Sequence, residues 1–308
     1  MMSRVRGAQL GAIAITAGAM AVAGCSSSSP DNPASGQASG SASTSAPASS
    51  GGASSGGGSL TAAQAIKDAA QHAQKATSYA ADMTVKTSGT ASSTISGTLK
   101  QQSKPSPLAV ADFSSVTVQG QQVPGGMQEI INSNGVYLKL AQLAKQTGKP
   151  WIKIPASDLS KVTGASFGQL LQNSGNDPLV QTQMLSSSTN VKKVGTATIN
   201  GVPTTEYTGT YPITAGLAKL PPATRNKIAS QLRAEGLTTE HFTVWLDDQQ
   251  QVRKVVSSAK GTSEQVSSTV TVTSVNQPVH ATIPPASQTA TVPASELGGS
   301  SNSGSTTS

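Results

Sequence analysis

The feature that most constrains the fold is a two-residue alternation of apolar and polar side chains, which recurs between residues 83 and 275. In the segment 241–246, Phe242, Val244 and Leu246 fall on one face of an extended chain, and the residues between them fall on the other. Antiparallel sheets with one solvated face show this pattern. The alternation therefore predicts a largely antiparallel sheet with one buried face.

The predicted strands are separated by turn signals. Asn134-Gly135 and Asn200-Gly201 each stand between two alternating segments, which is a strong signal for a two-residue hairpin. Asp247 begins a turn that ends at Gln250. The predicted strands are 83–86, 94–100, 108–118, 128–132, 136–140, 151–154, 191–199, 202–211, 241–246, 252–260 and 263–275.

Helical spacing of apolar residues predicts helices in three regions. The first, 61–79, opens with a Thr61 and Gln64 capping box and has a buried side made mostly of alanine, which allows close packing on a sheet. Short helices are predicted in 157–188, and one helix in 217–237. No strand-helix alternation is present, so we expect an α+β fold in which the helices cover the apolar face of the sheet.

The first 24 residues have the layout of a secretory signal peptide. Arg4 and Arg6 precede an uncharged, mostly apolar run, and small residues then lead to Cys25, the single cysteine. The run Val22-Ala23-Gly24-Cys25 resembles the bacterial lipobox. The resemblance implies diacylglyceryl transfer to Cys25, cleavage after Gly24, and a membrane partner reached through the N-terminal lipid. The predicted location is the outer face of the bacterial plasma membrane.

Composition divides the remaining chain into a domain and two flanking segments. Residues 25–59 are almost entirely Ser, Gly, Ala and Pro, which predicts a disordered tether. Residues 286–308 have a similar composition and are predicted to form a disordered tail. The expected folded unit is 60–285, long enough for one domain with a sizeable core.

Charge and residue usage exclude several function classes. Charged residues make up 11% of the chain, its net charge is +7, and no basic stripe carries interleaved aromatics, so nucleic-acid binding is not expected. With Cys25 lipidated, no thiol remains for a disulfide or a cysteine metal site. His72, His241 and His280 have no metal-ligand spacing, and no motif calls for a cofactor.

Two short motifs resemble functional sites but have simpler interpretations. Residues 164–168 match the G-x-S-x-G pattern of serine esterases, but the preceding residues form a poor buried strand and the predicted sheet is not parallel. Asp247-Asp248 could offer carboxylates to calcium, although adjacent acids at a hairpin tip are more often turn formers. We therefore expect neither catalysis nor a metal site.

Several segments resemble a known lipoprotein family. They are 199–207, 242–247, 252–254, 276–279 and 283–285. In this order behind a lipobox, they resemble the LppX/LprA/LprF/LprG lipoproteins of mycobacteria and, more remotely, LolA and LolB. The resemblance implies a curved antiparallel half-barrel wrapped around helices, with an apolar cavity for lipids. Glu206 departs from the family, where a histidine often stands, and only 3% of the residues are aromatic.

The resemblance makes the apolar side chains of the helical regions and of one strand the candidate cavity lining. For each of these residues, the alternative is that its side chain packs in the hydrophobic core and contacts no ligand. Two functions follow: a lipid-binding or lipid-carrying lipoprotein, or a structural or protein-interaction lipoprotein without a transported ligand. The candidates are Leu170, Leu171, Leu179, Met184, Leu185, Leu217, Leu220, Ile228, Leu232, Val244 and Leu246.

Overall fold

A computed structural model describes residues 61–89, 92–158, 182, 184–218 and 236–292. The predicted signal peptide, Cys25 and the tether lie outside these residues, as do most of the two predicted helical regions at 157–188 and 217–237. Among the described helices, none combines the length and hydropathy needed to cross a membrane.

Helix α1 (Ala62–Lys75) forms where the alanine-rich spacing predicts it. Thr61 Oγ1 accepts a hydrogen bond from the Gln64 N–H at 3.2 Å, which is the N-cap half of the predicted capping box. The Gln64 side chain instead donates to Asp68 at 2.7 Å. The prediction that the helix extends to Tyr79 is wrong, because the chain from Ser78 onward pairs with a neighbouring strand.

The sheet has 13 strands. Eleven of them correspond to predicted segments, whereas β4 and β13 were not predicted. Two short helices, α2 (Ala141–Thr147) and α6 (Ile213–Leu217), lie between described strands. Helix α2 was not predicted, and α6 shares only Leu217 with the helix predicted at 217–237. The strands are β1 (Ser78–Gly89), β2 (Ser93–Gln102), β3 (Leu108–Val118), β4 (Gln121–Gln122), β5 (Met127–Asn132), β6 (Gly135–Leu140), β7 (Trp151–Pro155), β8 (Lys192–Ile199), β9 (Val202–Pro212), β10 (Thr239–Leu246), β11 (Val252–Lys260), β12 (Glu264–Val275) and β13 (Thr289–Thr291).

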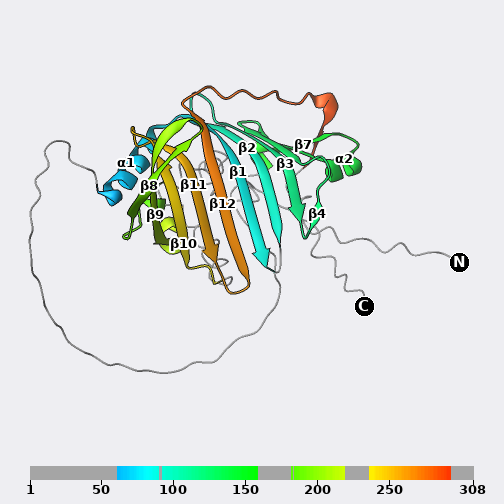
Figure 1. Cartoon of the computed structure of the whole chain (residues 1–308). Coiled ribbons are helices and arrows are strands. Elements are labelled where there is room, and N and C mark those ends of the chain that lie inside the picture. Colours follow the sequence, from blue (N-terminus) through cyan, green and yellow to red (C-terminus); the bar gives the residue numbers. More distant parts are fainter. Residues whose placement is uncertain (1–60, 90–91, 159–181, 183, 219–235, 293–308) are drawn as a thin grey trace, which may run out of the picture.

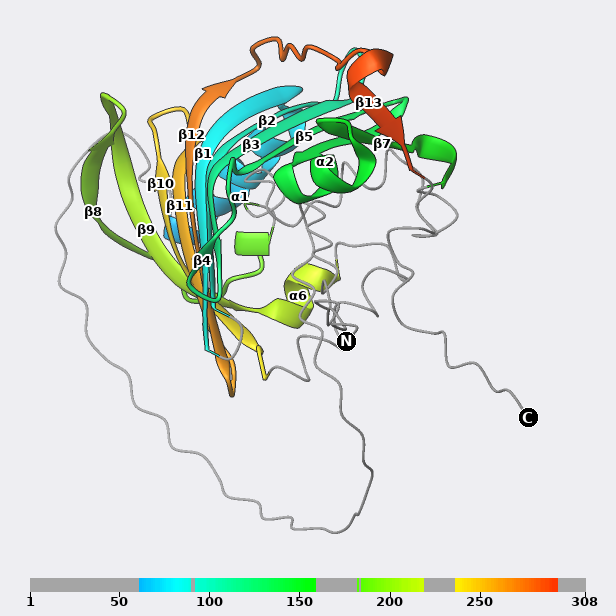
Figure 2. The ribbon, with the colours of Figure 1, turned by 90° about the vertical axis from the view of Figure 1, so that its right-hand side faces the viewer.

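One continuous, curved sheet results (Figure 1). Its order is β13-β7-β6-β5-β3-β2-β1-β12-β11-β10-β9-β8, and β4 pairs only with β3. All pairs are antiparallel except β13 with β7. The long β1–β12 pairing joins the first meander to the closing strands. Figure 2 shows the sheet bending around α1 and α6, which confirms the α+β class predicted from the alternation and the curved half-barrel implied by the family resemblance.

The turns explain how the hairpins form. Asn200 and Gly201 both have positive φ values, 48° and 79°, and Ile199 pairs with Val202, so the predicted two-residue turn is confirmed. In the other hairpin the prediction is one residue too late. Gly135 already pairs with Asn132, and Ser133 and Asn134 form the turn.

The predicted start of a disordered tail at residue 286 is wrong. A 3₁₀ turn, η1 (Ala286–Gln288), leads into β13, which adds a parallel edge strand to β7. Figure 1 shows the segment after β12 crossing the end of the sheet to reach this edge. Composition alone missed the strand because the short segment gains its backbone hydrogen bonds only from β7, which lies far away in the sequence.

The two faces of the sheet differ as the alternation predicts. On the convex face, lysines lie over aromatic rings: Lys254 Nζ is 4.9 Å from the Trp245 ring centre, and Lys153 Nζ is 5.6 Å from that of Tyr137.

The concave face carries two clusters of buried apolar residues. The α1 cluster is Ala65, Ile66, Ala69, Leu185, Tyr207, Tyr211, Phe242, Val244, Leu246, Val252, Val255 and Val272. The central cluster is Tyr79, Ala81, Met83, Val85, Leu99, Ala111, Phe113, Val116, Met127 and Val270.

Candidate ligand-binding face

A row of paired residues crosses the middle of the concave face. It is called the central row here, and runs from β12 to β7 through directly opposed partners. All its members are apolar except one. The central row is Val272, Ala81, Leu99, Ala111, Glu129, Leu138 and Ile152. Because directly opposed residues in a sheet point to the same face, the row presents a nearly unbroken apolar surface to the inside of the half-barrel.

Glu129 is the exception in the central row. Its side chain shares a face with Met127, two residues earlier on β5, and only 4% of the residue is exposed. Its Oε2 atom is buried and has no hydrogen-bond partner among the described residues. Burial disfavours the charged form and raises the pKa of this carboxyl to about 7. A carboxyl group of this kind is ready to accept or donate a hydrogen bond near neutral pH.

Two further buried polar atoms lie on the concave positions of β12. Ser268 Oγ and Glu264 Oε2 are both without a hydrogen-bond partner in the described part of the chain. Both residues share the face of Val270, because they stand two and six positions before it on the same strand. Buried polar groups in native proteins are almost always paired with protein or water. The concave face therefore offers unmet hydrogen-bonding capacity at more than one place.

The predicted lining residues fall into three groups. Val244, Leu246 and Leu185 are at most 1% exposed and meet in the α1 cluster, with Met184 packed against it. Leu217 is also buried, at the end of α6. Leu170, Leu171, Leu179, Leu220, Ile228 and Leu232 lie outside the described residues. The structure thus brings Met184, Leu185, Val244 and Leu246 together, and their role in ligand binding stays a prediction.

The α1 cluster is closely packed because the buried side of α1 is small. Ala65 and Ala69 are at most 1% exposed, so the helix backbone approaches the sheet. Tyr211 on β9 donates a hydrogen bond at 2.6 Å to Oε2 of Glu240, its directly opposed partner on β10. This half of the concave face is filled by protein side chains.

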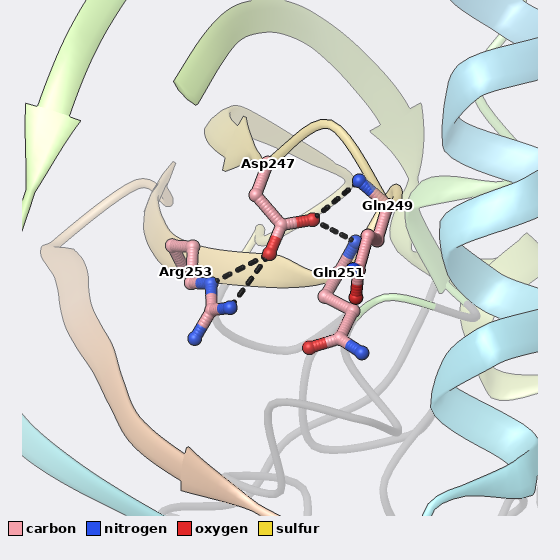
Figure 3. Close-up of polar contacts among 4 residues, drawn as sticks. All are labelled: Asp247, Gln249, Gln251 and Arg253. Atoms are coloured by element: carbon pink, nitrogen blue, oxygen red, sulfur yellow. Dashed lines mark hydrogen bonds and ion pairs between the residues drawn. The ribbon is translucent and has the colours of Figure 1, made fainter. Parts of the chain in front are cut away.

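Asp247 occupies a structural position in the turn between β10 and β11 (Figure 3). Its carboxylate accepts hydrogen bonds from the backbone N–H groups of Gln249 at 3.0 Å and Gln251 at 2.9 Å. Arg253 approaches the same carboxylate at 2.8 Å through Nε and at 2.7 Å through a terminal nitrogen. The interpretation of Asp247 as a turn former is therefore confirmed, and its oxygens are already engaged.

A cleft of about 310 Å³ lies beside this turn. Its walls are the last turns of α1, the turn that follows Asp247 with the first residue of β11, and the end of β12. It combines apolar and polar side chains, including His72 and Lys75, and its volume is at the small end of the range for ligand pockets, about 300–1,000 Å³. The lining residues are Ala69, His72, Ala73, Lys75, Ala76, Gln249, Gln251, Val252, Val275 and Asn276.

The described residues contain no cluster of His, Cys, Asp or Glu that could hold a metal ion. His72, His241 and His280 are all exposed. The esterase-like motif at 164–168 lies outside the described residues. Glu129 was missed by sequence reasoning, although one signal was available: it occupies an inward position between Met127 and Ile131 in the alternation of β5.

Comparison with known proteins finds a curated relative that matches part of the chain, and several solved structures of similar fold. No protein-family model matches. A curated protein from Streptomyces griseus, described as an uncharacterized 31.2 kDa protein in the rplA-rplJ intergenic region, is 34% identical over 113 residues. That match spans 35% of this chain and 36% of the relative, so the chain matches about a third of the relative's length.

Similar solved structures include three bacterial proteins. LprF from Mycobacterium bovis is 15% identical, with a TM-score of 0.45, and the match covers 73% of this chain and 96% of that protein. A LolA superfamily protein from Nitrosomonas europaea is 6% identical, with a TM-score of 0.27 and coverages of 72% and 96%. The lipoprotein LppX from Mycobacterium tuberculosis is 19% identical, with a TM-score of 0.40 and coverages of 71% and 97%.

Proposed function

We propose that this protein is an exported lipoprotein that binds a lipid or acylated molecule on the concave face of its sheet. A diacylglyceryl group on Cys25 would hold it at the outer face of the bacterial plasma membrane. The observation that carries the proposal is the central row, an apolar surface interrupted only by Glu129. The acyl chain of a lipid can pack on such a surface. The polar headgroup can then form hydrogen bonds with the buried groups that lack a partner.

The direct test is to look for a bound lipid. The Cys25→Ser chain, which lacks its own acyl groups, is purified without detergent, extracted with organic solvent, and the extract is analysed by mass spectrometry. The proposal expects a stoichiometric lipid or acylated molecule. A fluorescent fatty-acyl probe then checks binding to the extracted protein. No extracted lipid together with no saturable probe binding would contradict ligand binding.

Bulky substitutions separate a lined cavity from a filled core. Leu140 is a partly buried residue beside the central cluster, and Met184 is its counterpart beside the α1 cluster. We expect Leu140→Trp to weaken probe binding about tenfold or more with little change in the urea midpoint. Met184→Trp should instead cost about 1–3 kcal/mol of stability, as overpacking does in a closed core.

The matched control for these variants is Val194→Trp. Val194 stands on the edge strand β8 and is 53% exposed, so a tryptophan there adds bulk without entering the concave face. It should change neither probe affinity nor the urea midpoint. Equal losses of stability in Leu140→Trp and Met184→Trp, with probe binding unaltered, would show that the concave face is filled throughout.

The lipid anchor has its own prediction. Cys25→Ser should release the protein from the membrane, because a serine hydroxyl cannot form the thioether. Two acyl signals give stable anchoring, whereas one gives only marginal binding. Cell fractionation and the mass of the N-terminal peptide measure the effect. Unchanged cleavage and membrane association in this variant, and also under a globomycin-type peptidase inhibitor, would contradict the anchor.

A second function is favoured by one specific observation. The close packing of α1 on Val244 and Leu246 leaves that half of the face without exposed apolar surface. The members of the central row other than Leu138 are also at most 4% exposed. If protein side chains alone bury them, the protein would be a structural or protein-interaction lipoprotein without a transported ligand. The solvent extraction described above distinguishes the two functions.

A further inference from the structure

The concave face holds buried polar atoms that the fold itself does not use. Glu129 Oε2, Glu264 Oε2 and Ser268 Oγ all lack a hydrogen-bond partner among the described residues. Leaving such a group unpaired destabilises the folded state, and more so when the group is charged. Of the three, only Glu129 lies in the central row, within the apolar surface that the proposed lipid would cover.

Glu129 is the best placed of the three to meet a ligand. On β5 its inward neighbours are Met127 and Ile131, and its partners across the flanking strands are Ala111 and Leu138. All four are uncharged and apolar. The nearest charged residues in register, Asp112 and Lys139, alternate to the convex face. The carboxyl group therefore stands alone within a surface suited to an acyl chain.

We propose that Glu129 is the headgroup contact of the concave face, and that it selects acyl lipids with an uncharged, hydroxyl-bearing headgroup over lipids with an anionic one. This inference rests on the proposed lipid-binding function. A hydroxyl group can donate to the carboxylate, or accept from the carboxylic acid, so it satisfies Glu129 in either protonation state. A ligand carboxylate or phosphate would instead bring a second negative charge into an apolar environment, where repulsion is strong.

The pKa of Glu129, raised by burial to about 7, is consistent with this role. At pH 8 the group is largely ionised and repels an anion, while a hydroxyl donor stabilises it. Discrimination between the two headgroups should therefore be greatest above pH 7.

The test uses competition at pH 8 between two lipids with the same acyl chain. The Cys25→Ser chain is loaded with a fluorescent fatty-alcohol probe, which is displaced by monoolein or by oleate. We expect monoolein to compete at least about tenfold better than oleate, which corresponds to about 1.4 kcal/mol. Glu129→Gln should reduce this ratio below about threefold by removing the charge, and Glu129→Leu should in addition weaken monoolein binding.

The matched control is Glu264→Gln. Glu264 is another buried carboxyl on the concave face, 6% exposed, but β3, β2 and β1 separate its strand from β5. This variant should keep the wild-type preference. Suppose that the wild type binds the probe. If Glu129→Gln still prefers monoolein over oleate, or if Glu264→Gln loses this preference equally, the assignment to Glu129 is overturned. Lipid binding itself would still stand. If the wild type binds no probe, the proposed function fails first.

Discussion

Replacing Arg253 by methionine should lower the free energy of unfolding by about 2–3 kcal/mol, because it leaves the Asp247 carboxylate buried with too few partners. Asp247 is 3% exposed, and the guanidinium supplies two of its four hydrogen-bond contacts. The Arg253 side chain is itself 23% exposed, so solvent screens part of the interaction and the expected loss is below that of a fully buried pair. Urea unfolding of the wild type and variant measures the difference.

The matched control is Lys254→Met, one residue further along β11. Lys254 lies over the Trp245 ring at 4.9 Å, and an exposed contact of this type contributes about 0.5–1 kcal/mol. Its removal should therefore cost less than that of Arg253. The double variant Arg253→Met with Asp247→Asn should recover part of the loss, since no buried charge remains. A change below about 0.5 kcal/mol in Arg253→Met would contradict the structural role of the pair.

The second large effect concerns pH. Burial raises the pKa of Glu129 from 4.5 to about 7, so between these values the folded protein holds a proton that the unfolded chain has released. The free energy of unfolding should therefore fall as the pH rises from about 4.5 to about 7, and the Glu129 contribution should stay constant above that. The expected change is about 3 kcal/mol, from about 1.4 kcal/mol per pH unit.

Glu129→Gln isolates this contribution from all other titrating groups. Its concave neighbours on β3, β5 and β6 are uncharged, so no partner on these strands titrates with it. The variant should gain stability relative to the wild type as the pH rises, and urea unfolding at pH 5, 6, 7 and 8 measures the difference. A constant difference over this range would show that Glu129 ionises freely in the folded protein.

Local sequence determined the strands and the main turns. A strand needs only alternating side chains to define its two faces, and β3 and β11 have the bounds that the alternation predicts. A type I′ turn needs residues that tolerate positive φ, which Asn200 and Gly201 supply. Thr61 caps α1 through a hydrogen bond within four residues. Each of these features depends on neighbours in the chain, so the sequence was sufficient to predict it.

Tertiary structure decided the features that depend on distant partners. Ser78 leaves the helical path because β1 pairs with β2 and β12, and β13 is ordered only by β7. The candidate site also depends on residues that are distant in the sequence. Glu129 appears in the sequence as one acid among apolar residues, and its burial follows from the register that places it between Ala111 and Leu138. Sequence alternation determines which residues share a face, but only strand pairing and curvature decide what surrounds them, because those contacts join residues far apart in the chain.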